Sequence, residues 1–380
     1  MKKWAKHLLI FSTMLGTFSA TTALIPSSVF AAAGTTVQDQ LQKDITQALT
    51  NRLDSYQLTY SGTSASLKTD LNNALNAALN TNDYLHYIVK SYSYSANIQG
   101  STATVSLKFT YWETLSQTTE VQKRVKQILD DILTTGMNEH QKEKAIHDWI
   151  VGHVAYDTKL ISHSAYDALT KGKTVCQGYA LLTYEMMKQA GIPVKIVEGS
   201  SRGQSHAWNL VQIGGKWYQL DCTWDDPVPD VAGRVLYNYY NITDAQLRVD
   251  HTWKASTAYP TATTAYNETL TSLATTDTAN ATFYNKLYQS MGYSYLSEAN
   301  TATNVQTLTN KLRAAIDNRQ QSLTLRYTNG TTVTADLKKA FATQKGITSY
   351  SYTQEAFTRT TTNDKLLTVN FNYSGNNGKQ

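Results

Sequence analysis

Cys176 has the sequence setting of a chemical nucleophile in this 380-residue chain. It opens the apolar stretch CQGYALLTYEMMKQA, and Gly191 and Pro193 follow as helix stop signals. A helix N-terminus favours a thiolate through its dipole and its unpaired backbone N–H groups. The N–H of Cys176 itself could stabilise an oxyanion, and Gly178 would let a substrate backbone approach. The stretch therefore predicts a buried helix with a nucleophilic sulfur at its first turn.

A histidine and an aspartate follow on what reads as a β-hairpin. Residues 205–213 alternate as a strand does, Gly214-Gly215 suits a primed two-residue turn, and residues 216–222 return as the second strand. This hairpin would make His206 and Asp221 diagonal neighbours on one face, within reach of an imidazole–carboxylate hydrogen bond. The carboxylate would hold the tautomer of the ring and stabilise the imidazolium that forms. We therefore predict a Cys176–His206–Asp221 triad.

The two cysteines could also have other roles. A lone cysteine is often a small core residue, and Cys176 by itself would be read that way. A disulfide with Cys222 is disfavoured, because neighbouring strand residues face opposite sides and Asp221 would point to the site. The chain has no C-x-x-C pair and no histidine pair at ligand spacing, so we expect no metal and no other cofactor. Four histidines outside the triad are expected to be structural or solvated: His147, His153, His163 and His251.

Three sequence blocks resemble the transglutaminase-like superfamily, whose core is similar to that of papain-type thiol proteases. They are VCQGYA, SHAWN and WYQLDCTWDDP, within a resemblance that covers about residues 120–255. The resemblance implies an α+β core with helices packed on an antiparallel sheet. It also implies that Cys176 is the nucleophile, His206 the general base and Asp221 the orienting carboxylate. Cys222 departs from the family, which usually has proline there.

The same resemblance suggests the walls of the substrate cleft and the range of possible reactions. Gly178 and Tyr179 would lie in the cleft, with Trp208 and Trp224 as its walls. Members of the superfamily include amide cross-linkers, deamidases and peptidases, together with forms that have lost catalysis. The choice among cross-linking, deamidation and peptide hydrolysis stays open at this stage.

The two flanks of the central region, residues 36–115 and 301–380, show the same predicted order of elements. Each reads as helix, strand, helix and two further strands, the last pair in the first flank falling at 84–98 and 102–112. Several short segments also correspond: Asn51-Arg52 with Asn318-Arg319, Leu58-Thr59-Tyr60 with Leu325-Arg326-Tyr327, Asp70-Leu71 with Asp336-Leu337, and Phe109-Thr110-Tyr111 with Phe371-Asn372-Tyr373. We interpret the flanks as two copies of one small α+β module, serving either as folded spacers or as ligand-binding units.

Between these flanks, the end of the central region is less regular. A last strand is predicted near 237–242, and the Thr/Ala-rich residues 256–300 suggest a loosely packed connection.

The first 33 residues resemble an export signal. Lys2, Lys3 and Lys6 precede a largely apolar run, and small residues at 29–33 satisfy the cleavage rule. Without these residues the chain has 31 basic and 29 acidic side chains, and this near balance gives no case for nucleic-acid binding. The 25 tyrosines and the few charges suit an extracellular surface. We expect a secreted monomer without a transmembrane anchor after cleavage.

Two functions from different classes fit these observations. The first is a secreted cysteine acyl-transfer enzyme that forms a thioester from protein or peptide carboxamides. The second is a non-catalytic extracellular protein whose flanking modules bind cell-wall glycan or a partner. The triad favours the enzyme, with a protein or peptide substrate that is free or associated with the cell wall.

Overall fold

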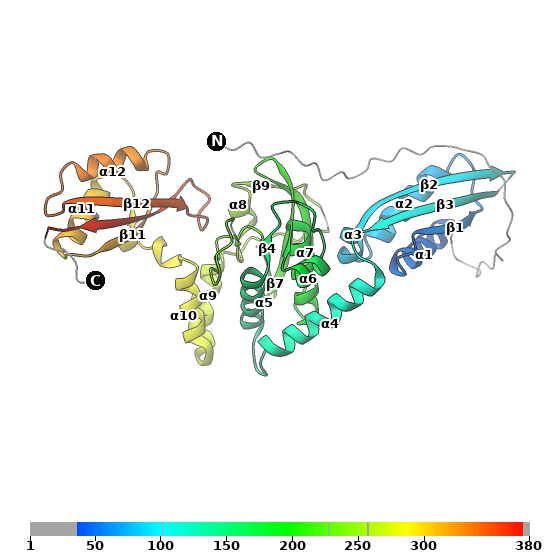
Figure 1. Ribbon diagram of the computed structural model, residues 1–380, viewed down its shortest axis with the longest axis horizontal. Coiled ribbons are helices and arrows are strands. Elements are labelled where there is room, and N and C mark those ends of the chain that lie inside the picture. The colour runs from blue at the N-terminus through cyan, green and yellow to red at the C-terminus, as the bar shows by residue number, and fades with distance from the viewer. Residues whose placement is uncertain (1–35, 101, 227, 257, 375–380) are drawn as a thin grey trace. The chain divides into compact units, whose positions relative to one another are not determined.

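The computed structural model describes residues 36–100, 102–226, 228–256 and 258–374 (Figure 1). The expected export signal at residues 1–33 lies outside this part of the chain. The chain divides into two compact units: the first runs to Gly214 and adds Asp226–Arg234 and Trp253–Ala255, and the second holds the remaining residues. Among the described residues, no helix is both long enough and apolar enough to cross a membrane. Helices and mainly antiparallel strands confirm the predicted α+β class.

The first unit begins with a small α+β layer. Its elements are α1 (Val37–Thr50), β1 (Ser55–Tyr60), α2 (Leu67–Leu79), α3 (Asp83–Ile88), β2 (Val89–Gln99) and β3 (Thr102–Tyr111). The strands form an antiparallel sheet in the order β1-β3-β2, with α1 and α2 beside it (Figure 1). Ile45 of α1 and Leu71 of α2 are fully buried, as their helical spacing requires.

Helix α3 corrects one expectation, because residues 84–88 were predicted to begin a strand. The side chain of Asn82 accepts a hydrogen bond from the N–H of Leu85 at 3.3 Å and caps the helix instead. A local cap therefore overrides the alternating pattern of apolar residues in this segment.

The central elements of the first unit follow this layer in the chain. They are α4 (Leu115–Ile132), α5 (Glu139–His153), β4 (Ala155–Tyr156), α6 (Ala165–Lys171), β5 (Lys173–Thr174), α7 (Cys176–Gln189), β6 (Val194–Ser201) and β7 (Gln204–Ile213). Asn138 caps α5 and Ser164 caps α6, each accepting a backbone hydrogen bond. Strands β6 and β7 pair antiparallel, and α7 packs against both of them and against α5 and α6.

The second unit begins with β8 (Lys216–Leu220), α8 (Asp244–Leu247) and β9 (His251–Thr252). The strand expected at 237–242 is absent from the described residues there; an isolated bridge joins Gln219 to Ile242. The segment 256–300 is not a loose connection. It contains α9 (Tyr266–Thr276) and α10 (Ala281–Ser290), whose side chains Leu270 and Leu287 are buried.

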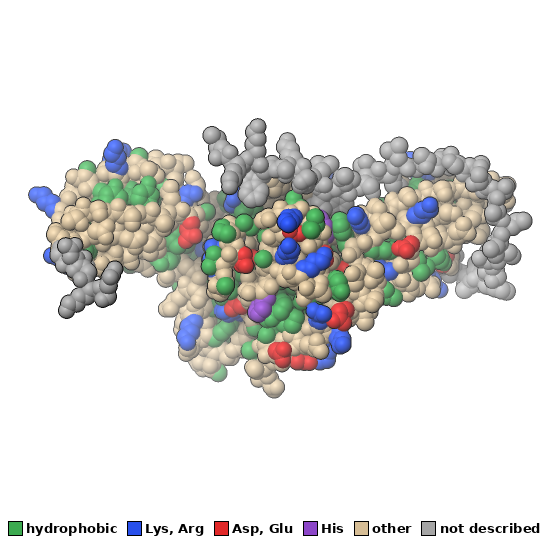
Figure 2. Space-filling view, in the orientation of Figure 1, with side chains coloured by type: hydrophobic (Ala, Val, Ile, Leu, Met, Phe, Trp, Pro, Cys, Tyr) green, Lys and Arg blue, Asp and Glu red, His purple; other side chains and the backbone are tan. Residues whose placement is uncertain are grey.

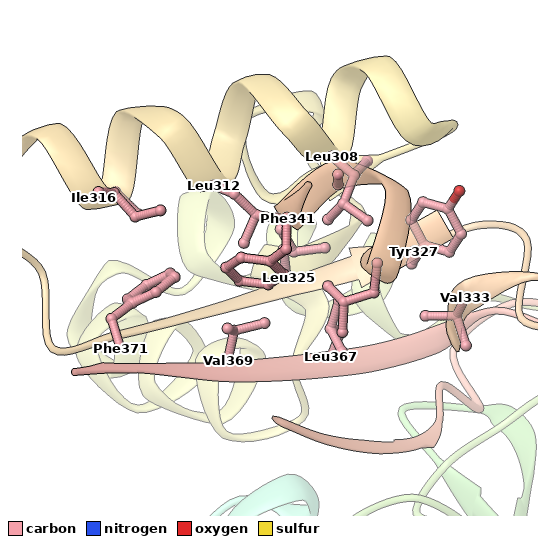
Figure 3. Packing of buried hydrophobic residues seen from close by; sticks show 14 of the residues in the cluster. Leu308, Leu312, Ile316, Leu325, Tyr327, Val333, Phe341, Leu367, Val369 and Phe371 are labelled. Carbon is pink, nitrogen blue, oxygen red and sulfur yellow. The ribbon is translucent and has the colours of Figure 1, made fainter. Parts of the chain in front are cut away.

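A second α+β layer ends the chain. Its elements are β10 (Thr301–Ala302), α11 (Val305–Asp317), β11 (Ser322–Tyr327), α12 (Val333–Phe341), β12 (Ser349–Ala356) and β13 (Lys365–Asn372). The sheet order is β10-β11-β13-β12, and only the short β10–β11 pair among these is parallel. Figure 3 shows side chains of α11 pointing toward the strands, where Leu308, Leu325 and Leu367 are fully buried.

The two α+β layers share a strand order and side-chain contacts that a similar amino-acid composition alone would not produce. The order β1-β3-β2 in the first matches β11-β13-β12 in the second. The hydroxyl of Tyr60 donates to Asp70 at 2.7 Å, and that of Tyr327 donates to Asp336 at 2.8 Å. The arginine after each first helix has a positive φ and lies over a tyrosine ring: Arg52 (φ 53°) over Tyr111, and Arg319 (φ 52°) over Tyr373. We propose that the layers are two copies of one module.

Removing either tyrosine hydroxyl tests this proposal. Tyr60→Phe and Tyr327→Phe should each lower the free energy of unfolding by about 1–2 kcal/mol, because each leaves a carboxylate without its tyrosine donor. Urea unfolding of the two variants measures the effect. A loss at one position and none at the other would contradict an equivalent role for the two tyrosines.

The surface in Figure 2 is dominated by uncharged polar groups and backbone. On this face, Lys and Arg side chains are scattered and interspersed with Asp and Glu.

Candidate active site

Cys176 is the first residue of α7. Its N-cap is Val175, which has an extended backbone and no capping side chain. The first N–H groups of a helix lack partners within the helix, so the start of α7 presents donors next to the sulfur. Cys176 is 6% exposed. Neither Cys176 nor Cys222 is in a disulfide, as predicted.

The start of α7 is also tied to the first α+β layer, which sequence reasoning did not anticipate. The side-chain amide of Gln177 donates to the carbonyl of Tyr87, in α3, at 2.6 Å. Asp83 of the same helix accepts from the N–H of Ile196 on β6 at 2.8 Å. The position of the residue next to Cys176 therefore depends on a module outside the transglutaminase-like resemblance.

Gly178 has a packing role in α7. A Cβ placed on it would lie 1.9 Å from Oγ1 of Thr174. That hydroxyl is buried and donates to the carbonyl of Ser162 at 3.1 Å. Only glycine fits beside Thr174 here, while the predicted approach of a substrate to Gly178 stays a prediction.

Tyr179 lies in the protein interior. Its hydroxyl is 2.8 Å from the carbonyl oxygen of Val154 and 2.5 Å from Oδ2 of Asp226. Burial raises the pKa of Asp226 to about 6, although the hydrogen bond from Tyr179 opposes that shift. The visible role of Tyr179 is to hold this carboxyl, and its predicted place in the substrate cleft remains a prediction.

Asp226 should therefore make stability depend on pH. With a raised pKa in the folded state, the folded chain binds a proton between about pH 4 and 6 that the unfolded chain releases. The contribution of this group is favourable at low pH and is lost as pH rises through 6. Asp226→Asn should stabilise the chain by about 1 kcal/mol at pH 7.5, a value discounted for solvent screening.

Urea unfolding of both forms at pH 7.5 and pH 4.5 checks this expectation. The advantage of Asp226→Asn should shrink at the lower pH. An advantage that grows as pH falls would contradict the assigned sign.

His206 lies on β7, opposite Gly199 of β6. It is 6% exposed, and its ring lies 5.7 Å from the ring of Trp208 with an interplanar angle of 22°. Trp208 is fully buried and meets Trp253 edge to face at 5.6 Å. Trp208 thus lies next to the imidazole, and its predicted role as a wall of the cleft stays a prediction. Trp253 was not foreseen because it is distant in sequence.

The turn after β7 has the predicted backbone, but the following strand is shorter than predicted. Gly214 and Gly215 have φ angles of 57° and 74°, as a primed turn requires. Strand β8 ends at Leu220 rather than at 222. The reason is local: Oδ1 of Asp221 accepts the N–H of Thr223 at 3.0 Å and closes a turn. The strand argument for the direction of Cys222 therefore does not apply.

The carboxylate of Asp221 is buried, and its surroundings in the second unit are well defined. Besides Thr223, the N–H of Trp224 donates to Oδ1 at 3.2 Å. Nε2 of His251 lies 3.2 Å from Oδ2. His251 is fully buried, so it is not solvated, and its pairing with Asp221 was missed because nothing local in the sequence indicates it. The half-buried Trp224 lies 6.0 Å from the ring of His251.

A helix that opens on a cysteine and a following β-hairpin that carries a histidine define the class of this core, a transglutaminase-like, cysteine protease-like fold. The family model of the transglutaminase-like superfamily matches residues 126–222. The chain therefore carries a domain of the transglutaminase-like superfamily, as the sequence blocks indicated.

Individual relatives are distant. Kyphoscoliosis peptidase of Mus musculus is 30% identical over 152 residues, which is 34% of this chain and 23% of the relative. The chain thus spans about a quarter of the length of this curated relative. A solved TGase structure is 15% identical and covers 37% of this chain and 46% of its own, at a TM-score of 0.26. A proposed cysteine protease from Cytophaga hutchinsonii is 15% identical and covers 49% and 68%, at a TM-score of 0.25.

Proposed function

We propose that this chain is a cysteine acyl-transfer enzyme with Cys176 as nucleophile, His206 as general base and Asp221 as the orienting carboxylate. The observation that carries the proposal is the superfamily match over residues 126–222, which contains all three residues in the family's order. The position of Cys176 at the first turn of a buried helix and the desolvated Asp221 carboxylate support it.

The proposed reaction begins at a carboxamide carbon of a protein or peptide. The Cys176 sulfur forms a bond to that carbon, and the oxygen becomes an oxyanion that the Cys176 N–H can stabilise. His206 passes the thiol proton to the leaving nitrogen, so that ammonia or an amine departs and a thioester remains. Water or a second amine then attacks the thioester and returns the proton through His206 to the sulfur.

The cellular context is part of the same proposal. The basic and apolar residues at 1–33 support export, and the few charged residues support an extracellular working place. Peptide hydrolysis belongs among the candidate reactions because one relative is named a peptidase. We propose a monomer whose substrates are protein or peptide carboxamides.

Ammonia release from a glutamine-bearing protein tests the proposal. Chain lacking residues 1–33 should release ammonia, and Cys176→Ser should not. Addition of a primary amine separates the outcomes, because incorporation of the amine indicates cross-linking whereas carboxylate formation indicates deamidation. New peptide termini would indicate peptide hydrolysis. The absence of all three kinds of product would contradict an acyl-transfer function.

A further inference from the structure

His251 is a buried imidazole held between two carboxylates. Its Nδ1 lies 2.6 Å from Oδ1 of Asp250, and its Nε2 lies 3.2 Å from Oδ2 of Asp221. The side chain is fully buried, whereas the Asp250 side chain is 21% exposed. Both ring nitrogens therefore face an anionic oxygen, an arrangement that sequence analysis did not anticipate.

The proton count of this group is constrained by its geometry. A neutral imidazole has one N–H, so with two ionised carboxylates one nitrogen lone pair would face an anionic oxygen. The arrangement is favourable when Asp221, Asp250 and His251 together hold one proton more than two ionised carboxylates and a neutral imidazole would hold. In the imidazolium form, each nitrogen donates to one carboxylate and partly compensates its charge.

The ring is held in place from several sides. The hydroxyl of Tyr239 donates to Oδ2 of Asp250 at 2.6 Å. This hydrogen bond fixes the carboxylate that contacts Nδ1 of His251. The ring of Tyr239 lies 5.5 Å from that of His251, and Trp224 meets it edge to face. The N–H of Asp221 also donates to the carbonyl of Tyr239 at 3.1 Å. Tyr239 thus connects the backbone of Asp221 to the group that contacts its side chain.

These contacts determine the orientation of the Asp221 carboxylate. Thr223 and Trp224 donate to Oδ1, and the imidazole of His251 contacts Oδ2. A carboxylate has about four acceptor positions, so three donors can hold it while leaving capacity for a further imidazole. His251 thus adds a contact at Oδ2 to the two backbone contacts at Oδ1, and together these contacts restrict rotation of the carboxylate about its bond to Cβ.

We propose that His251, held by Asp250, is a positioning residue that fixes the Asp221 carboxylate in the orientation its role toward His206 needs. The inference rests on the proposed triad and adds a second His–Asp pair to it. His251 acts through Asp221 and does not itself contact the reacting atoms in this account.

The rate of Cys176 alkylation by iodoacetamide, followed by peptide mass spectrometry from pH 5 to 9, tests this role. His251→Leu should lower the rate at pH 6 about tenfold and move the pH profile toward that of His206→Ala. His251→Gln keeps an N–H at the distance of Nε2 and should stay within about threefold of the native rate. Asp250→Asn, at a partly exposed position, should change the profile in the direction of His251→Leu.

Controls separate positioning from general loss of structure. His147 is another fully buried histidine, 3.1 Å from Asp148, so His147→Gln should change stability without moving the pH profile. Thermal unfolding establishes that each variant is folded; should His251→Leu not fold, Asp250→Asn and His251→Gln decide the matter. If folded Asp250→Asn and His251→Leu chains keep the native pH profile, and their alkylation still depends on His206, the positioning role is wrong and the proposed triad is unaffected. Equal rates for the native chain and His206→Ala would instead refute the triad.

Discussion

Replacing Asp221 by Asn should lower kcat for ammonia release about 10³- to 10⁴-fold while the chain stays folded. Asn keeps the shape of the side chain, and its oxygen can still accept the N–H groups of Thr223 and Trp224. It removes the negative charge that would stabilise the His206 imidazolium and select its tautomer. The expected loss therefore falls on catalysis, and KM should change much less.

Asp225→Asn is the matched control for this substitution. Asp225 is equally buried, lies in the same turn, and accepts the N–H of Tyr239 at 2.8 Å, but it has no role in the proposed triad. Steady-state kinetics of both variants at pH 7 compare the two carboxylates. An Asp221→Asn rate within a few-fold of the native rate would contradict the assigned role, as would an equal loss in Asp225→Asn.

Gly178→Ala should destabilise the chain by about 2–4 kcal/mol, because the added methyl group has no room. The new Cβ would lie 1.9 Å from Oγ1 and 2.7 Å from Cβ of Thr174. Thr174 has little freedom to yield, because it is fully buried and its hydroxyl is bonded to backbone carbonyls of Ser162 and Ser164. The start of α7 would have to shift, and the Cys176 sulfur with it.

Gly152→Ala in α5 should have the opposite effect on stability. A Cβ on Gly152 meets no atom within 4 Å, so the substitution should raise helix propensity and add about 0.5–1 kcal/mol of stability. Urea unfolding at pH 7 measures both variants. Stability unchanged by Gly178→Ala would mean that Thr174 and α7 can move apart without cost, which contradicts the packing described here.

The features that sequence predicted correctly depend on local patterns. Helix α7 was delimited by Cys176 and by Gly191, whose φ of 81° ends it as expected. The turn at Gly214-Gly215 followed from the need for positive φ at both residues. Side-chain caps such as Asn138 are local features of the same kind, since they act within three residues of the helix they begin.

The errors arose where a local cap or a tertiary contact outweighs the pattern. Asn82 converts the start of an apparent strand into α3, and the carboxylate of Asp221 ends β8 two residues early. Thr/Ala-rich composition concealed α9 and α10, which are stabilised by burial of side chains such as Leu270. The contact of His251 with Asp221 joins residues 30 positions apart, and no spacing rule for a single chain reveals it.

Alkylation by iodoacetamide at pH 6 of the chain without residues 1–33 tests whether Cys176 is a nucleophile activated by His206. Peptide mass spectrometry reads Cys176 and Cys222 separately in the native chain and in His206→Ala. We expect rapid modification of Cys176, slow modification of Cys222, and loss of the Cys176 preference in His206→Ala. A Cys176 that reacts no faster than an ordinary thiol, or that reacts equally fast without His206, would contradict it.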